Sequence, residues 1–138
     1  VFEEHSANKT MPADTGRIVV DALTYADEPG AEPYFHDQLV WCDDTPDSKV
    51  QMAVWRRELG IRVHPARKAR MRRLSYDWLA GLREIVIDPA RCPRTFEEFT
   101  CKEFLRDRDG RWIDEIPDGD DHSIDAVRYA MMDDVLRG

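Results

Sequence analysis

A strand, helix and second strand predicted between residues 39 and 64 constrain the fold of this chain most strongly. The run Leu39–Cys42 is short, continuous and apolar, which is typical of a strand buried on both faces. Thr45 then provides a helix N-cap and Pro46 a first helical residue, while Gly60 predicts the end of that helix. A second strand, Ile61–His64, follows directly. Because a helix connects the two strands, we expect them to pair in parallel within an α/β sheet.

The rest of the chain continues this alternation of strands and helices. We expect a polar tail at residues 1–16 and a single domain over residues 17–138. Within that domain the pattern predicts a strand over 17–25, a loop over 26–38, a helix carrying Leu74 to Leu82, a strand over 84–87, a hairpin over 104–112 and a final helix from His122. Strands that alternate with helices indicate an α/β fold with helices flanking the sheet.

Composition excludes several classes of function. The chain has 138 residues and 42% hydrophobic content, without an apolar run near the roughly 20 residues of a membrane span. No signal peptide is recognisable, so we expect a cytoplasmic protein with no membrane contact. The three cysteines lack any Cys-x-x-Cys pair, which argues against a disulfide framework or a zinc ribbon. The sequence also lacks a Gly-rich phosphate loop and a Gly-x-Ser-x-Gly elbow.

An acidic run at residues 118–121 leads into the final helix and predicts metal-binding chemistry. Asp120 or Asp121 can cap this helix, and helical spacing then places His122 and Asp125 on one face, with Tyr129 one turn further along. A carboxylate and an imidazole three residues apart, next to Asp121, are a candidate ligand group for a divalent cation. The alternative is a capping cluster with a structural histidine, because acidic residues favour helix N-termini for electrostatic reasons alone.

A second candidate ligand, Asp43, follows the buried strand Leu39–Cys42. Open α/β sheets place their ligands at the C-terminal ends of strands. Asp43 and Asp125 together predict a pair of Mg²⁺ or Mn²⁺ ions roughly 4 Å apart, an arrangement that serves phosphodiester hydrolysis. His122 is then a metal ligand or a proton carrier. The alternative for Asp43 or Asp44 is a capping role at the helix that follows.

The distribution of charge agrees with a nuclease. Net charge is −8, yet residues 62–73 contain bases and no acid, whereas residues 114–125 contain acids and no base. A basic strip that holds phosphates beside an acidic group that holds cations is typical of metal-dependent nucleases, although charge runs also occur on simple solvated faces. The residues predicted to bind backbone phosphates of DNA are Arg67, Lys68, Arg70, Arg72 and Arg73.

From about Arg17 to the end, the chain resembles the C-terminal nuclease domain of tailed-bacteriophage terminase large subunits, which has an RNase H-like fold. The matching pieces occur in order, namely the strand ending at Tyr25, residues 41–50, residues 59–68, the strand 85–88, Glu97-Glu98 and the helix motif His122-x-x-Asp125-Ala-Val-Arg-Tyr129. The resemblance implies an endonuclease that uses two divalent metals to cut concatemeric viral DNA during genome packaging. It maps two family acids to Asp43 and Asp125, and a histidine of some members to His122. The implied partners are double-stranded DNA, the packaging ATPase domain, the portal and the small terminase subunit.

One family feature is missing from this sequence. The family's first metal ligand lies on an initial central strand in an Asp-x-Gly-like context, and residues 1–16 offer no apolar strand to carry it. Asp14-Thr15-Gly16 has the required letters, but the residues before it are polar. The alternative to an active endonuclease is therefore a truncated or degenerate prophage copy, which lacks the first central strand, completes its sheet as a homodimer, and binds DNA or a packaging partner without cutting. An RNase H-like resolvase or RNase is a third alternative.

Overall fold

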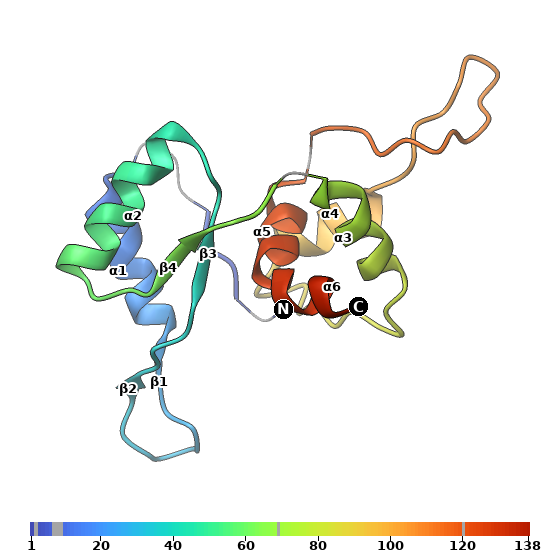
Figure 1. Ribbon diagram of the computed structural model, residues 1–138. Coiled ribbons are helices and arrows are strands. Elements are labelled where there is room, and N and C mark those ends of the chain that lie inside the picture. Colours follow the sequence, from blue (N-terminus) through green and yellow to red (C-terminus); the bar gives the residue numbers. More distant parts are fainter. Residues whose placement is uncertain (2, 7–9, 69, 120) are drawn as a thin grey trace. The chain divides into compact units, whose positions relative to one another are not determined.

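The chain forms two compact units, as shown by a computed structural model that describes residues 1, 3–6, 10–68, 70–119 and 121–138. The N-terminal unit comprises residues 5–67, and the C-terminal unit comprises residues 68–138 together with residues 1–4. Both helices and short strands occur, so the predicted mixed α/β class is confirmed (Figure 1). In the part of the chain that is described, no helix is long and apolar enough to cross a membrane.

The N-terminal unit contains two small sheets and two helices. Its elements are α1 (Pro12–Ala22), β1 (Thr24–Tyr25), β2 (Tyr34–Phe35), β3 (Val40–Cys42), α2 (Pro46–Glu58) and β4 (Val63–Pro65). β1 and β2 pair antiparallel, within a segment largely predicted as a loop. β3 and β4 pair in parallel, with Val40 opposite Val63 and Trp41 opposite His64. The predicted strand, helix and parallel strand are thus confirmed.

Local signals around α2 act as the sequence predicts. The hydroxyl of Thr45 accepts a hydrogen bond from the amide of Ser48 at 3.2 Å, and the Ser48 hydroxyl accepts one from the Thr45 amide at 2.7 Å. This reciprocal capping box satisfies two amides that the helix itself cannot bond. At the other end, Gly60 has a φ of +65°, a left-handed conformation that favours glycine.

The prediction of a strand over residues 17–25 is wrong, because α1 occupies Pro12–Ala22 and only Thr24–Tyr25 is extended. Pro12 stands at the first helical position, and its fixed φ favours a helix start. Val19 and Val20 then pack against the buried core from this helix, so tertiary packing overrides their preference for strands. The helix also begins inside the segment predicted as a tail, and Asp14-Thr15-Gly16 lies on it rather than on a strand.

The core of the N-terminal unit lies where α1 and α2 meet the parallel strands. Its buried members are Cys42, Met52, Trp55, Ile61 and Val63. α1 and α2 lie side by side (Figure 1), and the indole of Trp55 donates a 2.8 Å hydrogen bond to the Pro12 carbonyl. Gly16 is the buried residue of α1 at this contact, and its lack of a Cβ atom lets the two helices approach closely.

The C-terminal unit is largely helical in its described residues. It contains α3 (Met71–Ala80), α4 (Pro93–Cys101), α5 (His122–Ala130) and α6 (Met132–Arg137). The predicted hairpin is confirmed by an antiparallel bridge between Arg106 and Trp112, with Gly110 at a φ of +77° in the turn. The predicted strand over 84–87 is wrong. Val86 is 68% exposed, and residues 84–87 pair with no described strand.

We predict that Gly16→Ala destabilises the N-terminal unit. A Cβ atom at this position would lie 2.3 Å from Leu59 Cδ1 and 2.8 Å from Trp55 Cδ1. Alanine favours a helix over glycine by up to about 1 kcal/mol, but crowding of a packed contact costs about 1–3 kcal/mol. The free energy of unfolding, measured in urea, should therefore fall. Asp21→Ala, on the exposed face of α1, is the control and should change it by less than about 0.5 kcal/mol. An unchanged urea midpoint for Gly16→Ala would show that α1 and α2 can move apart without loss of stability.

Candidate functional site

The Asp125 carboxylate is held on one side by a buried arginine. Arg128, one turn along α5, donates from Nη2 at 2.7 Å and from Nε at 3.2 Å, and both bonds reach the same oxygen, Oδ1. Arg128 is 4% exposed and also donates to the Ser75 hydroxyl of α3 at 2.8 Å. The Asp125 side chain remains 26% exposed. Arg128 makes no hydrogen bond to Oδ2 of Asp125. This second oxygen is therefore the atom that Asp125 can offer to a metal ion.

Burial raises the pKa of Asp125 above its ordinary value, and the positive charge of Arg128 acts in the opposite direction. The nearby negative charge of Asp121 raises the pKa further. The ionised carboxylate is therefore poorly solvated and only partly compensated. Such a group gains more from a bound cation than a fully solvated carboxylate does.

Asp121 is bonded to two cations. It is the N-cap residue of α5, but its side chain makes no capping hydrogen bond. Its Oδ2 instead accepts from Arg72 at 3.4 Å and from Lys102 Nζ at 3.3 Å. Lys102 also donates to the carbonyls of Pro117 at 2.7 Å and Gly119 at 2.8 Å. These contacts support an anchoring role for Asp121 in the acidic loop, and its direct binding to metal stays a prediction. Asp120, the other predicted cap, lies outside the described residues.

His122 opens α5 and is exposed. It lines a polar cavity of about 710 Å³ whose other charged lining residues are Arg94, Glu97, Glu98, Lys102, Glu103 and Asp118. Imidazole and carboxylate are both donors that Mn²⁺ accepts, so the chemistry of His122 and Asp125 fits such an ion. Among the residues that the structure describes, however, no group of three or more histidine, cysteine or acidic side chains gathers as a complete metal site.

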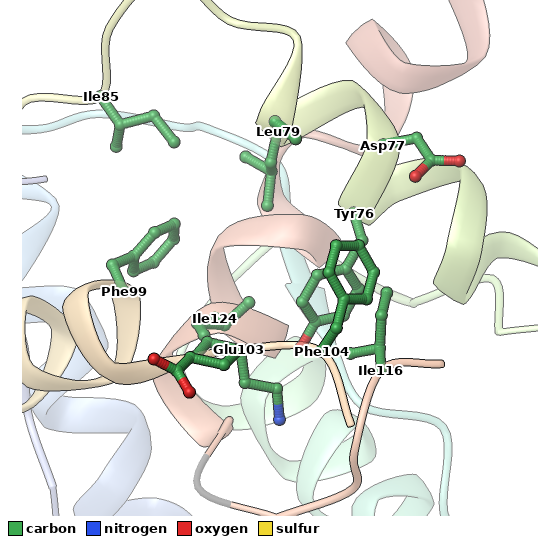
Figure 2. Close-up of a pocket in the computed structure, with 11 residues that line it drawn as sticks. Tyr76, Asp77, Leu79, Ile85, Phe99, Glu103, Phe104, Ile116 and Ile124 are labelled. Carbon is green, nitrogen blue, oxygen red and sulfur yellow. The ribbon is translucent and has the colours of Figure 1, made fainter. Parts of the chain in front are cut away.

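An apolar cavity of about 320 Å³ in the same unit contains a buried hydroxyl. Leu79, Phe99, Phe104 and Ile124 are among its lining residues, and Figure 2 shows them around Tyr76. The Tyr76 hydroxyl is buried without a hydrogen-bond partner in the described part of the chain. Burial is the main reason why the pKa of Tyr76 rises to about 12. Tyr76 is therefore neutral near pH 7 and is not a candidate general base.

Asp43 lies in the N-terminal unit, directly after β3. Its side chain is exposed, and its carbonyl accepts a hydrogen bond from the Ser48 hydroxyl, which fixes the backbone at this position. The caps of α2 are Thr45 and Ser48, so neither Asp43 nor Asp44 is the N-cap of this helix. The structure thus places Asp43 at the C-terminal end of a parallel strand, as predicted, and argues against the capping alternative.

The predicted phosphate-binding strip divides into two groups. Arg72 bonds to Asp121, and Arg73 bonds to Asp77 at 2.9 Å and to Asp114 at 2.8 Å, contacts that raise the pKa of Arg73. Arg67, Lys68 and Arg70 are exposed. Three of the acids that pair with the strip, Asp114, Asp118 and Asp121, are more than 40 residues away in sequence, which is why the charge pattern did not reveal them.

Glu98 is a further functional candidate. It belongs to the Glu97-Glu98 pair of the sequence resemblance, for which no role was predicted. It lies on α4, and its Oε2 accepts from the amides of Ser123 at 2.7 Å and Ile124 at 3.0 Å. These amides belong to the first turn of α5, the turn that carries His122 and Asp125. The contact spans 25 residues of chain, so no local motif predicts it.

Comparisons with known proteins agree with the predicted resemblance. Residues 42–133, more than half of the chain, match the family described as the terminase RNase H-like domain. The terminase large subunit of Bacillus phage SPP1 is 43% identical over 61 residues, which are 44% of this chain and 14% of that protein. This chain therefore spans a small part of that relative's length.

Among solved structures, this chain is similar to the crystal structure of the large terminase nuclease domain from bacteriophage SPP1 with bound Mn. The TM-score is 0.76 at 27% identity, and the match covers 96% of this chain and 69% of that chain. The predicted RNase H-like fold class is thereby confirmed.

We predict that Arg128→Met lowers the free energy of unfolding by on the order of 3 kcal/mol at pH 7, because the Asp125 carboxylate and the Ser75 hydroxyl lose a buried donor. The pKa of Asp125 should rise further in this variant. The loss should consequently shrink as the pH falls through the raised pKa of Asp125, because a protonated carboxyl needs no cation. Urea denaturation at several pH values measures both effects.

The control for this prediction is Arg137→Met, because Arg137 is 79% exposed and its ion pair with Asp134 is 3.9 Å long. We expect a change near zero for this variant. An equal loss at all pH values for Arg128→Met would mean that the arginine acts through packing and not through the charge of Asp125.

Proposed function

This chain belongs to the family of terminase RNase H-like domains, and we propose that it is a metal-dependent endonuclease domain that cuts concatemeric viral DNA during phage genome packaging. The observation that carries the proposal is the start of α5. There an exposed His122 is followed, three residues later, by a half-buried carboxylate whose Oδ2 is not used by Arg128. The likeness to a phage nuclease domain solved with bound Mn supports the same conclusion.

We propose Mn²⁺ or Mg²⁺ as the cofactor, with two ions in the working site. Asp125 and His122 are the proposed ligands in the C-terminal unit, and Asp43 is the proposed ligand in the N-terminal unit. Bound ions of this kind supply an activated water and stabilise the leaving oxygen. The residues of the chain have separate tasks. Arg128 favours the ionised form of the Asp125 carboxylate and orients it, and His122 either binds metal or moves a proton.

Double-stranded DNA is the proposed substrate, held through its backbone phosphates. Arg67, Lys68 and Arg70 are exposed, and we propose that they contact the phosphates. Arg72 and Arg73 bond to acids of the same unit. Contacts with phosphates give affinity without sequence specificity. The packaging ATPase domain, the portal and the small terminase subunit are the proposed protein partners.

A second candidate function is DNA or partner binding without cleavage. One observation favours it, because the described residues contain no complete group of three metal donors. In this alternative, Asp125 and Asp121 serve only the folding of the C-terminal unit, through Arg128, Arg72 and Lys102. Cleavage assays separate the two candidates directly.

We predict Mn²⁺-dependent nicking of a supercoiled plasmid that EDTA abolishes. Asp125→Asn should lower the rate by at least about 100-fold, since loss of a mere supporting residue at a metal site already costs about 10–100-fold. Asp43→Asn should behave similarly. Asp133→Asn, an exposed acid on α6, is the matched control and should cut normally. If the parent chain is folded by circular dichroism but inactive, the non-cleaving candidate is correct.

We also predict that Arg70→Gly weakens DNA binding without loss of stability. Arg70 has a φ of 59°, which glycine adopts at no cost, so the melting temperature should stay level or rise. Removal of one phosphate contact should reduce the salt dependence of binding by about one ion. Fluorescence anisotropy with duplex DNA at several salt concentrations measures this, with exposed Arg83→Ala as the control. An unchanged salt slope would remove Arg70 from the proposed DNA contact.

A further inference from the structure

The start of α5 is capped by a side chain from another helix. The first amides of a helix have no partner within it and are usually bonded by the side chain of the N-cap residue. Here the N-cap residue Asp121 makes no such bond, because its carboxylate faces Arg72 and Lys102. Glu98 of α4 takes over this task with a single oxygen, Oε2, which accepts from Ser123 and Ile124.

The helix that supplies this cap is itself fixed at its start. The Glu4 carboxylate accepts from the amides of Arg94 at 3.0 Å and Thr95 at 2.8 Å, and from the Thr95 hydroxyl at 2.6 Å. Burial would raise the pKa of Glu4, but the hydrogen bonds from Thr95 and Arg94 outweigh it, so this pKa is lowered. Thr95 is 2% exposed. α4 therefore provides a firm base from which Glu98 reaches α5.

Three contacts from the end of α4 complete the arrangement. Lys102, the residue after this helix, holds the loop before α5 through the carbonyls of Pro117 and Gly119 and the carboxylate of Asp121. Glu98 thus bonds the first turn of α5, and Lys102, one turn further along, bonds the loop that leads to it. Separation of the first turn of α5 from α4 would break the hydrogen bonds of Glu98.

We infer that Glu98 is a positioning residue for the proposed nuclease reaction, setting the place of His122 and Asp125 through the amides of Ser123 and Ile124. The inference rests on the proposed function. Glu98 need not touch metal or DNA for this role. Its oxygen acts on the backbone between the two candidate ligands, so loss of the bond frays the one turn that contains both of them.

The test measures amide hydrogen exchange by NMR and Mn²⁺ affinity by calorimetry on the whole chain, without reference to cleavage. In Glu98→Ala, exchange at Ser123 and Ile124 should accelerate about tenfold or more, and Mn²⁺ affinity should fall about tenfold. Exchange in α1 and α2 should stay unchanged. Glu98→Gln keeps an acceptor oxygen and should remain within about threefold of the parent in both measurements. Asp133→Ala removes an exposed charge of α6 and should match the parent.

Three outcomes would overturn the inference. Unchanged exchange at Ser123 and Ile124 in Glu98→Ala would show that the cap does not hold the turn. Normal exchange combined with lost Mn²⁺ affinity in Glu98→Gln would show that the charge of Glu98 acts on the ion itself. Equal effects in Asp133→Ala would point to general electrostatics. If Glu98→Ala does not fold, Glu98→Gln and Glu98→Asp still separate these cases. A parent chain that binds no Mn²⁺ would instead refute the proposed function, and the exchange data would still report on the cap.

Discussion

The buried guanidinium of Arg128 is the contact on which the candidate site of the C-terminal unit depends. It joins α5 to Ser75 of α3, and it keeps a desolvated Asp125 carboxylate in one orientation. A buried arginine is costly unless its donors are satisfied, so this cluster stabilises the unit only when all of its members are present. The same arrangement leaves one oxygen of Asp125 for a further cation. Stability and the proposed chemistry are thus linked through one side chain.

Charge neutralisation inside the C-terminal unit explains why runs of charge were only a partial guide to function. The acidic loop before α5 is paired with Arg72 and Lys102, while Arg73 is paired with Asp77 and Asp114. The pairs of Asp121 with Arg72 and Lys102 are part-buried, whereas the pairs of Arg73 are exposed. The candidate ligand-binding side chains of this unit that stay at least partly exposed include His122, Asp125 and Arg70.

The sequence allowed prediction of features that depend on local chemistry. Thr45, Pro46 and Gly60 determine both ends of α2, and the spacing of His122 and Asp125 places them on one turn of α5. Features that depend on distant contacts were not predictable. α1 is helical because its valines pack on a core formed later in the chain, and the Glu98 cap and the Arg72–Asp121 pair join residues 25 and 49 positions apart. Residues 84–87 have a composition that suits a strand, but a strand also needs a partner from elsewhere in the chain, and no described strand pairs with them.

The proposal to test first is that the first turn of α5 binds a divalent cation. Paramagnetic broadening in a ¹H–¹⁵N NMR spectrum titrated with Mn²⁺ tests it most directly, because the ion erases signals from nearby amides. The account predicts that the amides of His122 to Asp125 disappear at the lowest Mn²⁺ concentrations and survive in Asp125→Asn. Broadening that reaches exposed acids such as Asp133 equally early, or that is unchanged in Asp125→Asn, would contradict it.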